Sequence, residues 1–83
     1  MNYSVYILQS MKNGAYYKGM TDNISKRISK HNNGEVQSTK RYVPWKLVWS
    51  TQKTSKTEAA FLERKLKNIT SRKRLEDFMQ KYS

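Results

Sequence analysis

An Asn-Gly pair near the start of the chain, Asn13-Gly14, is the feature that most constrains how this sequence can fold. A type I′ turn needs positive φ at both central residues, and this pair is the strongest short signal for a β-hairpin. Before the pair, Tyr3 to Gln9 alternates like a strand and has largely apolar residues on both faces, as a buried strand does. After it, Ala15 to Met20 is predicted to be the antiparallel partner strand. The chain therefore begins with a hairpin.

The register of this hairpin decides where two tyrosines lie. With a two-residue loop, Tyr6 lies opposite Thr21 and Tyr17 lies opposite Ser10. Both tyrosines then project from the same face of the sheet, because side chains alternate along a strand. Taken alone, either tyrosine is more often an amphipathic core residue than a catalytic one.

A helix is predicted after the hairpin. Thr21 and Asp22 are both good N-caps, and Gly34 is a good residue to follow the last turn. One stripe of this helix has the spacing i, i+3, i+4 and i+7, and its members are Ile24, Arg27, Ile28 and His31. A purely structural stripe would carry leucine or isoleucine at all four positions. Such departures from the local rule concentrate at functional sites.

One more strand is predicted in the second half of the chain. We expect a polar, mobile loop over Glu35 to Arg41 and a strand over Tyr42 to Ser50. Alternation places Trp45, Leu47 and Trp49 on one face of that strand.

Two helices, Lys56 to Asn68 and Ser71 to Tyr82, complete the predicted fold. The apolar stripe of the first contains Ala59, Leu62, Leu66 and Ile69, and that of the second contains Leu75, Phe78, Met79 and Tyr82. Glu63 lies on the flank of the first stripe, at its boundary with solvent. The order β-β-α-β-α-α predicts one small α+β domain over residues 1–83, with a short antiparallel sheet covered by helices.

Composition narrows the classes of partner. The chain has no cysteine, which excludes a disulfide scaffold and a cysteine-ligated zinc site. Its 17 Lys and Arg against 6 Asp and Glu give a net charge of +11, which indicates a polyanionic partner, most commonly nucleic acid. No apolar run reaches the roughly 20 residues that cross a bilayer, and the N-terminus lacks the features of a signal peptide. We expect a cytoplasmic protein that does not bind membranes.

Five side chains together supply what phosphodiester hydrolysis requires, namely Tyr6, Tyr17, Arg27, His31 and Glu63. A tyrosine can act as the base if its pKa falls well below about 10, and a neighbouring Arg27 or divalent ion lowers that pKa. Arg27 can bind phosphate oxygens in bidentate geometry, and His31 can accept the tyrosyl proton or orient that tyrosine. Glu63 can ligate a hard cation; with a single carboxylate bound, the ion keeps several waters, as Mg²⁺ prefers.

Each of these residues also has a structural interpretation. Arg27 alone fits a solvated helix residue, and His31 alone fits a packed or capping histidine near a helix end. Glu63 alone could pair with Lys67 one turn later. Their coincidence in one strongly basic domain is what favours a shared functional site.

Taken together, these residues resemble the signature of the GIY-YIG nuclease superfamily. Its two motifs correspond to Ser4-Val5-Tyr6 and Tyr17-Lys18-Gly19, separated by the predicted hairpin. The similarity continues through Met20-Thr21-Asp22 to Lys26-Arg27, His31-Asn32-Asn33-Gly34, Thr39-Lys40, Pro44-Trp45-Lys46-Leu47-Val48, and Glu58-Ala59-Ala60 followed by Glu63 and Lys67. It covers nearly the whole chain and is greatest to compact, single-domain bacterial members.

The resemblance implies a three-stranded antiparallel sheet flanked by helices and one divalent metal, Mg²⁺ or Mn²⁺, at Glu63. It implies catalytic roles for the five residues named above, with Tyr6 activating water and Tyr17 lining the site or binding phosphate. Gly19 would allow close backbone packing beside the site.

Two positions depart from the family's motifs. Ser4 replaces the first glycine, and Lys18 stands where an apolar residue is usual. By strand alternation Lys18 points away from Tyr17 and extends the basic surface. Asn68 is the candidate counterpart of an asparagine found late in many members.

The sequence is compatible with three functions. The favoured one is a metal-dependent endonuclease-like protein that hydrolyses phosphodiester bonds of DNA in preference to RNA, in repair or recombination. Its candidate phosphate-binding cations outside the five-residue site are Lys18, Lys40, Arg41, Lys67, Arg72 and Arg74. The alternative is a non-catalytic nucleic-acid-binding module that has kept the nuclease fold. A protein-interaction adaptor using Trp45 and Trp49 is less favoured, because both lie at core-like alternate positions.

Overall fold

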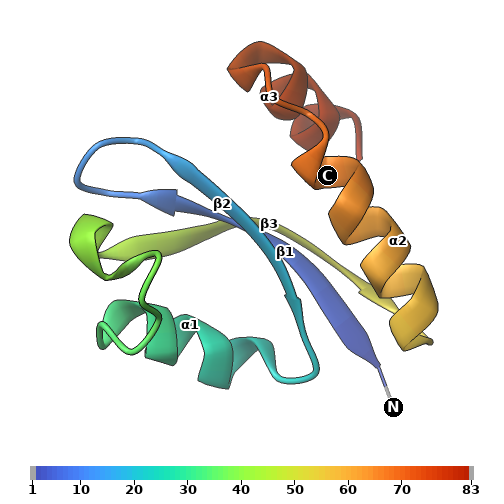
Figure 1. The fold of residues 1–83 in the computed structure, drawn as a ribbon. Helices are drawn as coiled ribbons and strands as arrows, with labels where there is room; N and C mark the ends of the chain where they lie inside the picture. Colours follow the sequence, from blue (N-terminus) through green and yellow to red (C-terminus); the bar gives the residue numbers. More distant parts are fainter. Residues whose placement is uncertain (1, 83) are drawn as a thin grey trace.

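The computed structural model describes residues 2–82. Its elements in chain order are β1 (Tyr3–Ser10), β2 (Tyr16–Thr21), α1 (Ile24–Asn32), the short 3₁₀ helix η1 (Lys40–Tyr42), β3 (Trp45–Lys53), α2 (Lys56–Lys67) and α3 (Arg72–Lys81) (Figure 1). The three strands form one antiparallel sheet. The predicted α+β class and the order β-β-α-β-α-α are confirmed.

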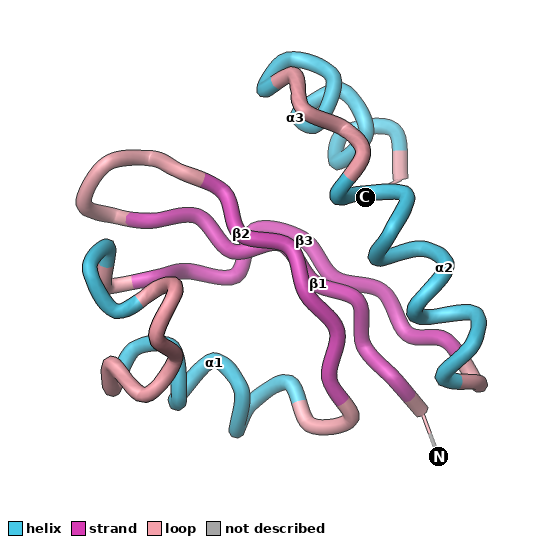
Figure 2. Tube along the Cα trace, in the orientation of Figure 1, coloured by secondary structure: helices cyan, strands magenta, loops and turns pink. Residues whose placement is uncertain are grey.

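β1 is the central strand of the sheet, whose order is β2-β1-β3 (Figure 2). Val5 and Ile7 pack on one face with residues of α2 and α3, whereas Tyr6 and Leu8 pack on the other face with residues of α1. All four of these side chains are buried, as expected for a strand that is apolar on both faces. The sheet therefore separates two small cores, with α1 on one side and α2 and α3 on the other.

The hairpin forms where it was predicted, but its register is different. Tyr6 lies opposite Gly19, and Leu8 lies opposite Tyr17. The prediction that Tyr6 pairs with Thr21 is therefore wrong by two residues. A shift of two residues leaves every side chain on its face. The prediction that Tyr6 and Tyr17 share a face is accordingly confirmed, and Tyr17 packs against the cluster that contains Tyr6.

The loop explains the register. The Ser10 amide donates to the Ala15 carbonyl at 2.8 Å, so residues 11–14 all lie within the loop. The Ser10 hydroxyl accepts from the amides of Lys12 and Asn13 at 3.0 and 3.2 Å, and these hydrogen bonds stabilise the loop. Gly14 has a φ of +77°, but no non-glycine residue among 2–82 has positive φ. A type I′ turn at Asn13-Gly14 is excluded because Asn13 does not adopt the conformation it needs.

β3 carries a β-bulge at Val48, where its pairing with β1 shifts by one residue. The bulge turns the side chains after it to the opposite face. Trp45 packs in the core beside α1, Trp49 packs in the core beside α2 and α3, and Leu47 is 42% exposed. The prediction that these three residues share one face is wrong, because a single extra residue inverts the alternation.

The helices are capped by short polar side chains. α1 begins later than predicted, because Asn23 is its N-cap and accepts from the Lys26 amide at 3.1 Å. It ends before Gly34, which has the expected positive φ of +76°. Ser55 and Ser71 cap α2 and α3, and both helices lie where the apolar stripes predicted them.

Candidate active site

Three aromatic rings from three elements meet on the α1 side of the sheet. The ring centroids of Tyr6 and Tyr17 are 6.4 Å apart, those of Tyr6 and His31 are 6.0 Å apart, and those of Tyr17 and His31 are 4.8 Å apart. The Tyr6 hydroxyl lies 3.2 Å from Nε2 of His31. Tyr6 is 1% exposed and His31 is fully buried, so this hydrogen bond is shielded from water.

Gly19 makes room for the Tyr6 ring. A Cβ added at Gly19 would lie 2.6 Å from the Tyr6 hydroxyl oxygen and 2.8 Å from Cζ. It would also lie 3.2 Å from Cε1 of Tyr17. Because β2 presents only a hydrogen atom at this position, the hydroxyl end of Tyr6 can lie close to the backbone of the neighbouring strand.

Arg27 joins this cluster from α1. The Tyr6 hydroxyl, and more weakly the Tyr17 hydroxyl, raise the pKa of Arg27 further above its ordinary value, against the opposing effect of burial. Its Nε is buried and has no hydrogen-bond partner among residues 2–82. Arg27 also lines a surface hollow of about 200 Å³ at the start of α1, together with Lys26 and Lys30. The guanidinium group therefore connects the buried tyrosines with a cationic part of the surface.

Arg27 lowers the pKa of Tyr6, as predicted, but the net shift from the ordinary value is upward. Burial raises the pKa of Tyr6, and the opposing effect of Arg27 is smaller. The neighbouring Tyr17 and the charge of Glu63 raise it further. Tyr6 is thus a neutral phenol at neutral pH. Its proton has to be transferred to a neighbour before its oxygen can act as a base.

His31 is the neighbour placed to receive that proton. Burial, and then the charge of Arg27, lower the pKa of His31, so the imidazole is neutral at neutral pH. Its Nδ1 lies 2.8 Å from the hydroxyl of Thr39, a residue that is 1% exposed. The expectation of a mobile loop over residues 35–41 fails at Thr39, because this residue is part of the buried site.

Trp45 and Asn32 hold Thr39 in place. The Trp45 indole Nε1 donates to the Thr39 carbonyl at 2.9 Å. The Asn32 side chain accepts from the Trp45 amide at 2.6 Å and donates to its carbonyl at 3.1 Å. The motif-like segments of the sequence contain both Thr39 and Asn32, but no local pattern shows that either supports the site.

Glu63 lies on α2 and is the predicted metal ligand. Its carboxylate is 3.6 Å from the Lys67 ammonium, and its side chain is 22% exposed. Its charge is among those that act on Tyr6. No group of three or more His, Cys, Asp or Glu residues that could hold a metal exists within residues 2–82. A single carboxylate of this kind would leave most coordination positions of a hard divalent ion to water.

The six predicted phosphate-binding cations lie in different surroundings. Lys40 and Arg41, on η1, and Arg74, on α3, are exposed. Lys67 is paired with Glu63. The Lys18 ammonium donates to the Ile69 carbonyl at 2.8 Å, and burial lowers its pKa. Lys18 thus joins β2 to the segment between α2 and α3.

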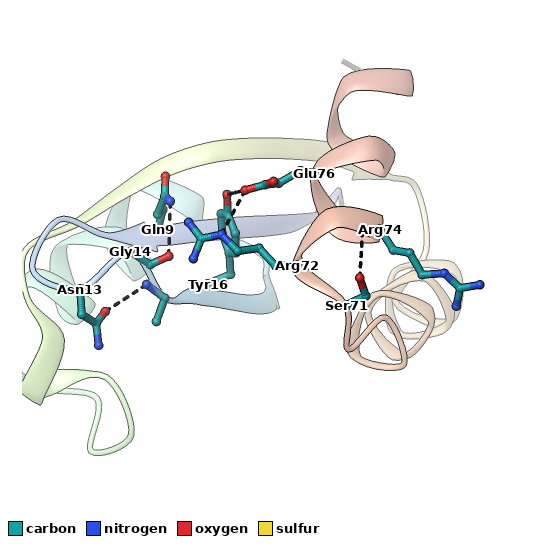
Figure 3. Close-up of polar contacts among 9 residues, drawn as sticks. Gln9, Asn13, Gly14, Tyr16, Ser71, Arg72, Arg74 and Glu76 are labelled. Carbon is teal, nitrogen blue, oxygen red and sulfur yellow. Dashed lines mark hydrogen bonds and ion pairs between the residues drawn. The ribbon is translucent and has the colours of Figure 1, made fainter.

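Arg72 packs against the hairpin (Figure 3). Its Nε lies 3.2 Å from the Glu76 carboxylate, and its guanidinium carbon lies 5.0 Å from the centre of the Tyr16 ring. The Tyr16 hydroxyl donates to the same carboxylate at 2.9 Å. A Cβ on Gly14 would lie 3.5 Å from the Arg72 side chain. Arg72 therefore attaches α3 to β2 and the hairpin loop, whereas Arg74 extends away in Figure 3.

The described surface has larger hollows than the one beside Arg27. One of about 440 Å³ follows α2 and is lined by Lys53, Thr57, Glu58, Phe61, Leu62 and Lys65. It contains none of the five predicted catalytic residues. Among residues 2–82 no helix is long and apolar enough to span a membrane.

Comparison with known proteins defines the class to which this fold and site belong. Residues 2–76 match the model of the GIY-YIG catalytic domain, and the chain belongs to the GIY-YIG family, a nuclease-type superfamily.

Several bacterial proteins are individually similar to the chain. It is 37% identical over 75 residues to the UPF0213 protein BH0048 of Halalkalibacterium halodurans, covering 89% of this chain and 79% of that protein. It is 40% identical over 77 residues to the UPF0213 protein CPE1444 of Clostridium perfringens, covering 92% and 81%. The solution NMR structure of the UPF0213 protein BH0048 from Bacillus halodurans has a TM-score of 0.63 and 36% identity, covering 96% of this chain and 84% of that one.

Proposed function

We propose that this protein is a metal-dependent endonuclease that hydrolyses phosphodiester bonds of DNA in the cytoplasm, during repair or recombination. The observation that carries the proposal is the meeting of Tyr6, Tyr17, Arg27 and His31 around one buried hydroxyl, in a GIY-YIG chain with a net charge of +11. A core chosen for stability alone would not bury an arginine nitrogen without a partner.

Arg27 is the proposed phosphate-binding residue. A phosphate oxygen bound in the hollow beside Arg27 would accept hydrogen bonds from its guanidinium group. Lys26 and Lys30 line the same hollow and would attract the neighbouring phosphate groups of the bound DNA strand. Tyr17, which is less deeply buried than Tyr6, is proposed to line the other side of the bound phosphate.

Tyr6 and His31 are proposed to take up the proton of the attacking water. The phenol transfers its own proton to Nε2 of His31 while its oxygen accepts a proton from water. The resulting hydroxide forms the new bond to phosphorus, the bond to the leaving oxygen breaks, and solvent protonates that oxygen. The lowered pKa of His31 keeps the imidazole neutral and available as acceptor before each turnover.

Glu63 is proposed to hold one Mg²⁺ or Mn²⁺ ion. When bound, such an ion would supply positive charge to the scissile phosphate and lower the pKa of a coordinated water. In its absence Glu63 is neutralised in part by Lys67, at 3.6 Å.

A cleavage screen over plain, flapped and branched DNA and matching RNA, with and without Mg²⁺ or Mn²⁺, tests this function. We expect metal-dependent cutting of DNA that falls by about 100-fold or more in Glu63→Gln and Arg27→Ala, with DNA binding retained. Glu58→Gln, on the same helix as Glu63, is the matched control and should still cut. Cleavage that persists in both Glu63→Gln and Arg27→Ala would overturn the site.

A non-catalytic nucleic-acid-binding module is the second candidate. The near-complete burial of Tyr6 and its raised pKa favour it, because both restrict access of water to a base. Binding that weakens steeply with salt, without cutting of any substrate, would support this alternative. In that case Arg74→Ala should reduce the salt slope by about one charge.

A further inference from the structure

We propose that Thr39 is a positioning residue that fixes His31 as the Nδ1–H tautomer and so leaves Nε2 free to accept the proton of Tyr6. Thr39 touches neither water nor phosphate in this arrangement and acts only through the imidazole. The catalytic consequence rests on the proposed function, but the tautomer itself does not.

The tautomer of His31 follows from which buried groups can donate a hydrogen bond and which can accept one. The Thr39 hydroxyl lies 2.8 Å from Nδ1 of His31 and 3.4 Å from the Val36 carbonyl oxygen. In the Nδ1–H tautomer the hydroxyl accepts from Nδ1–H and directs its own proton to the Val36 carbonyl, which also accepts from the amides of Thr39 and Lys40. A neutral imidazole with a proton on Nδ1 has a bare Nε2, which accepts from the Tyr6 hydroxyl at 3.2 Å.

The opposite tautomer satisfies fewer groups. With the proton on Nε2, Tyr6 would accept from His31 and would need another acceptor for its own proton. Arg27 offers only donors, so its hydrogen bond with Tyr6 cannot take up the phenol proton. The Thr39 hydroxyl would have to turn toward Nδ1 and leave its bond to Val36.

The fold keeps Thr39 from relaxing away from His31. The Thr39 carbonyl accepts from the Trp45 indole at 2.9 Å, and its amide donates to the Val36 carbonyl at 3.1 Å. The residue is 1% exposed, so water does not compete for its hydroxyl. The charged and titratable groups that face His31 are Tyr6 from β1, Tyr17 from β2 and Arg27 on its own helix. Of these, Tyr6 is bonded to Nε2, whereas Nδ1 has its hydrogen bond with the Thr39 hydroxyl.

His31 is the only histidine in the chain, so the tautomer can be read directly. Protein labelled with ¹⁵N-histidine gives one pair of ring nitrogen signals in a long-range ¹H–¹⁵N correlation spectrum. At about pH 7.5 we expect a pyrrole-type Nδ1 and a pyridine-type Nε2. A pyrrole-type Nε2 in the wild-type protein would overturn the proposal, whatever the variants do.

Two variants test Thr39 itself. Thr39→Val keeps the shape and removes the hydroxyl, and it should lose the single Nδ1–H pattern in favour of Nε2–H or a mixture. Thr39→Ser keeps the hydroxyl and should keep the wild-type pattern. An unchanged tautomer in Thr39→Val would show that Thr39 does not set it. If Thr39→Val fails to fold, the wild-type spectrum still decides the tautomer, and Thr39→Ser still has to match it.

Activity provides a separate readout. If the protein cleaves DNA, Thr39→Val should lower kcat more than it raises KM and should alter the pH profile, and Thr39→Ser should restore both. An absence of cleavage in the wild-type protein would count against the proposed function and would leave the tautomer measurement intact.

Discussion

Replacing Gly19 with alanine tests the packing on which the whole site depends. In an open strand position, Gly→Ala stabilises by about 0.5–1 kcal/mol, because glycine loses more conformational freedom on folding. At Gly19 the new Cβ would instead lie 2.6 Å from the Tyr6 oxygen and 2.8 Å from Cζ. These contacts are far shorter than any ordinary van der Waals distance. The sign of the stability change therefore depends on whether Tyr6 can move.

The structure indicates that Tyr6 moves only at a cost. It is 1% exposed and is held by its hydrogen bond to His31. Overpacking of this kind costs about 1–3 kcal/mol, and loss of the hydrogen bond adds about 0.5–1.5 kcal/mol. After subtraction of the gain expected in a strand, we predict that Gly19→Ala destabilises by about 0.5–4 kcal/mol. For a domain of this size, Tm should fall by about 2–30 °C.

A double-mutant cycle separates this clash from a general effect on the strand. Tyr6→Phe removes the oxygen and with it the closest contact, so Gly19→Ala should cost clearly less in the Tyr6→Phe background. Gly34→Ala is the control: its φ is +76° and the nearest atom to its new Cβ is 3.8 Å away, so its cost should not depend on Tyr6. Unfolding in urea, followed by circular dichroism, gives the four free energies. A Gly19→Ala protein as stable as the wild type would refute the reasoning.

Two further measurements test other parts of the structure. Arg72→Ala should lower the free energy of unfolding by about 1 kcal/mol, because it removes an exposed ion pair and a cation–π contact. The control Arg74→Ala should change the free energy of unfolding by less than about 0.3 kcal/mol. Equal effects of the two substitutions would contradict the attachment of α3 to the hairpin by Arg72. Because the pKa of His31 is lowered, the unfolded chain binds a proton at a higher pH than the folded one. Stability should be full above about pH 6.5 and fall by up to about 1.4 kcal/mol per pH unit from there down to the folded pKa. Urea unfolding between about pH 7.5 and 5.5 should show this loss, and an equal loss in His31→Gln would assign it to other groups.

Much of this fold follows from local patterns. The spacing of apolar residues predicted the three strands and the three α-helices, because that spacing shows which faces of an element are buried. The shared face of Tyr6 and Tyr17 survived an error of two residues in register, since only odd shifts exchange faces. Arg27 and His31 stood out because they interrupt an apolar stripe.

The remainder depends on contacts between distant segments. The bulge at Val48 has no signal in its own sequence, since it arises from how β3 meets β1. The raised pKa of Tyr6 follows from the depth of its burial, which no residue type reveals. Thr39 enters the site because Trp45 and Asn32 fold its loop back against α1. A contact of that kind cannot be read from spacing alone.

The bulge in β3 also bears on which changes in chain length the protein can tolerate. Trp45 and Trp49 fill cores on opposite sides of one sheet. Val48 is the extra residue between them, and its bulge places the two side chains on opposite faces. Because Val48 is the extra residue, deleting it would leave Trp45 opposite Ser10 and Trp49 opposite Ile7, on opposite faces of a regular strand. Loss of this one residue should therefore leave both cores filled. The two cores should also unfold together, because β1 contributes buried side chains to both.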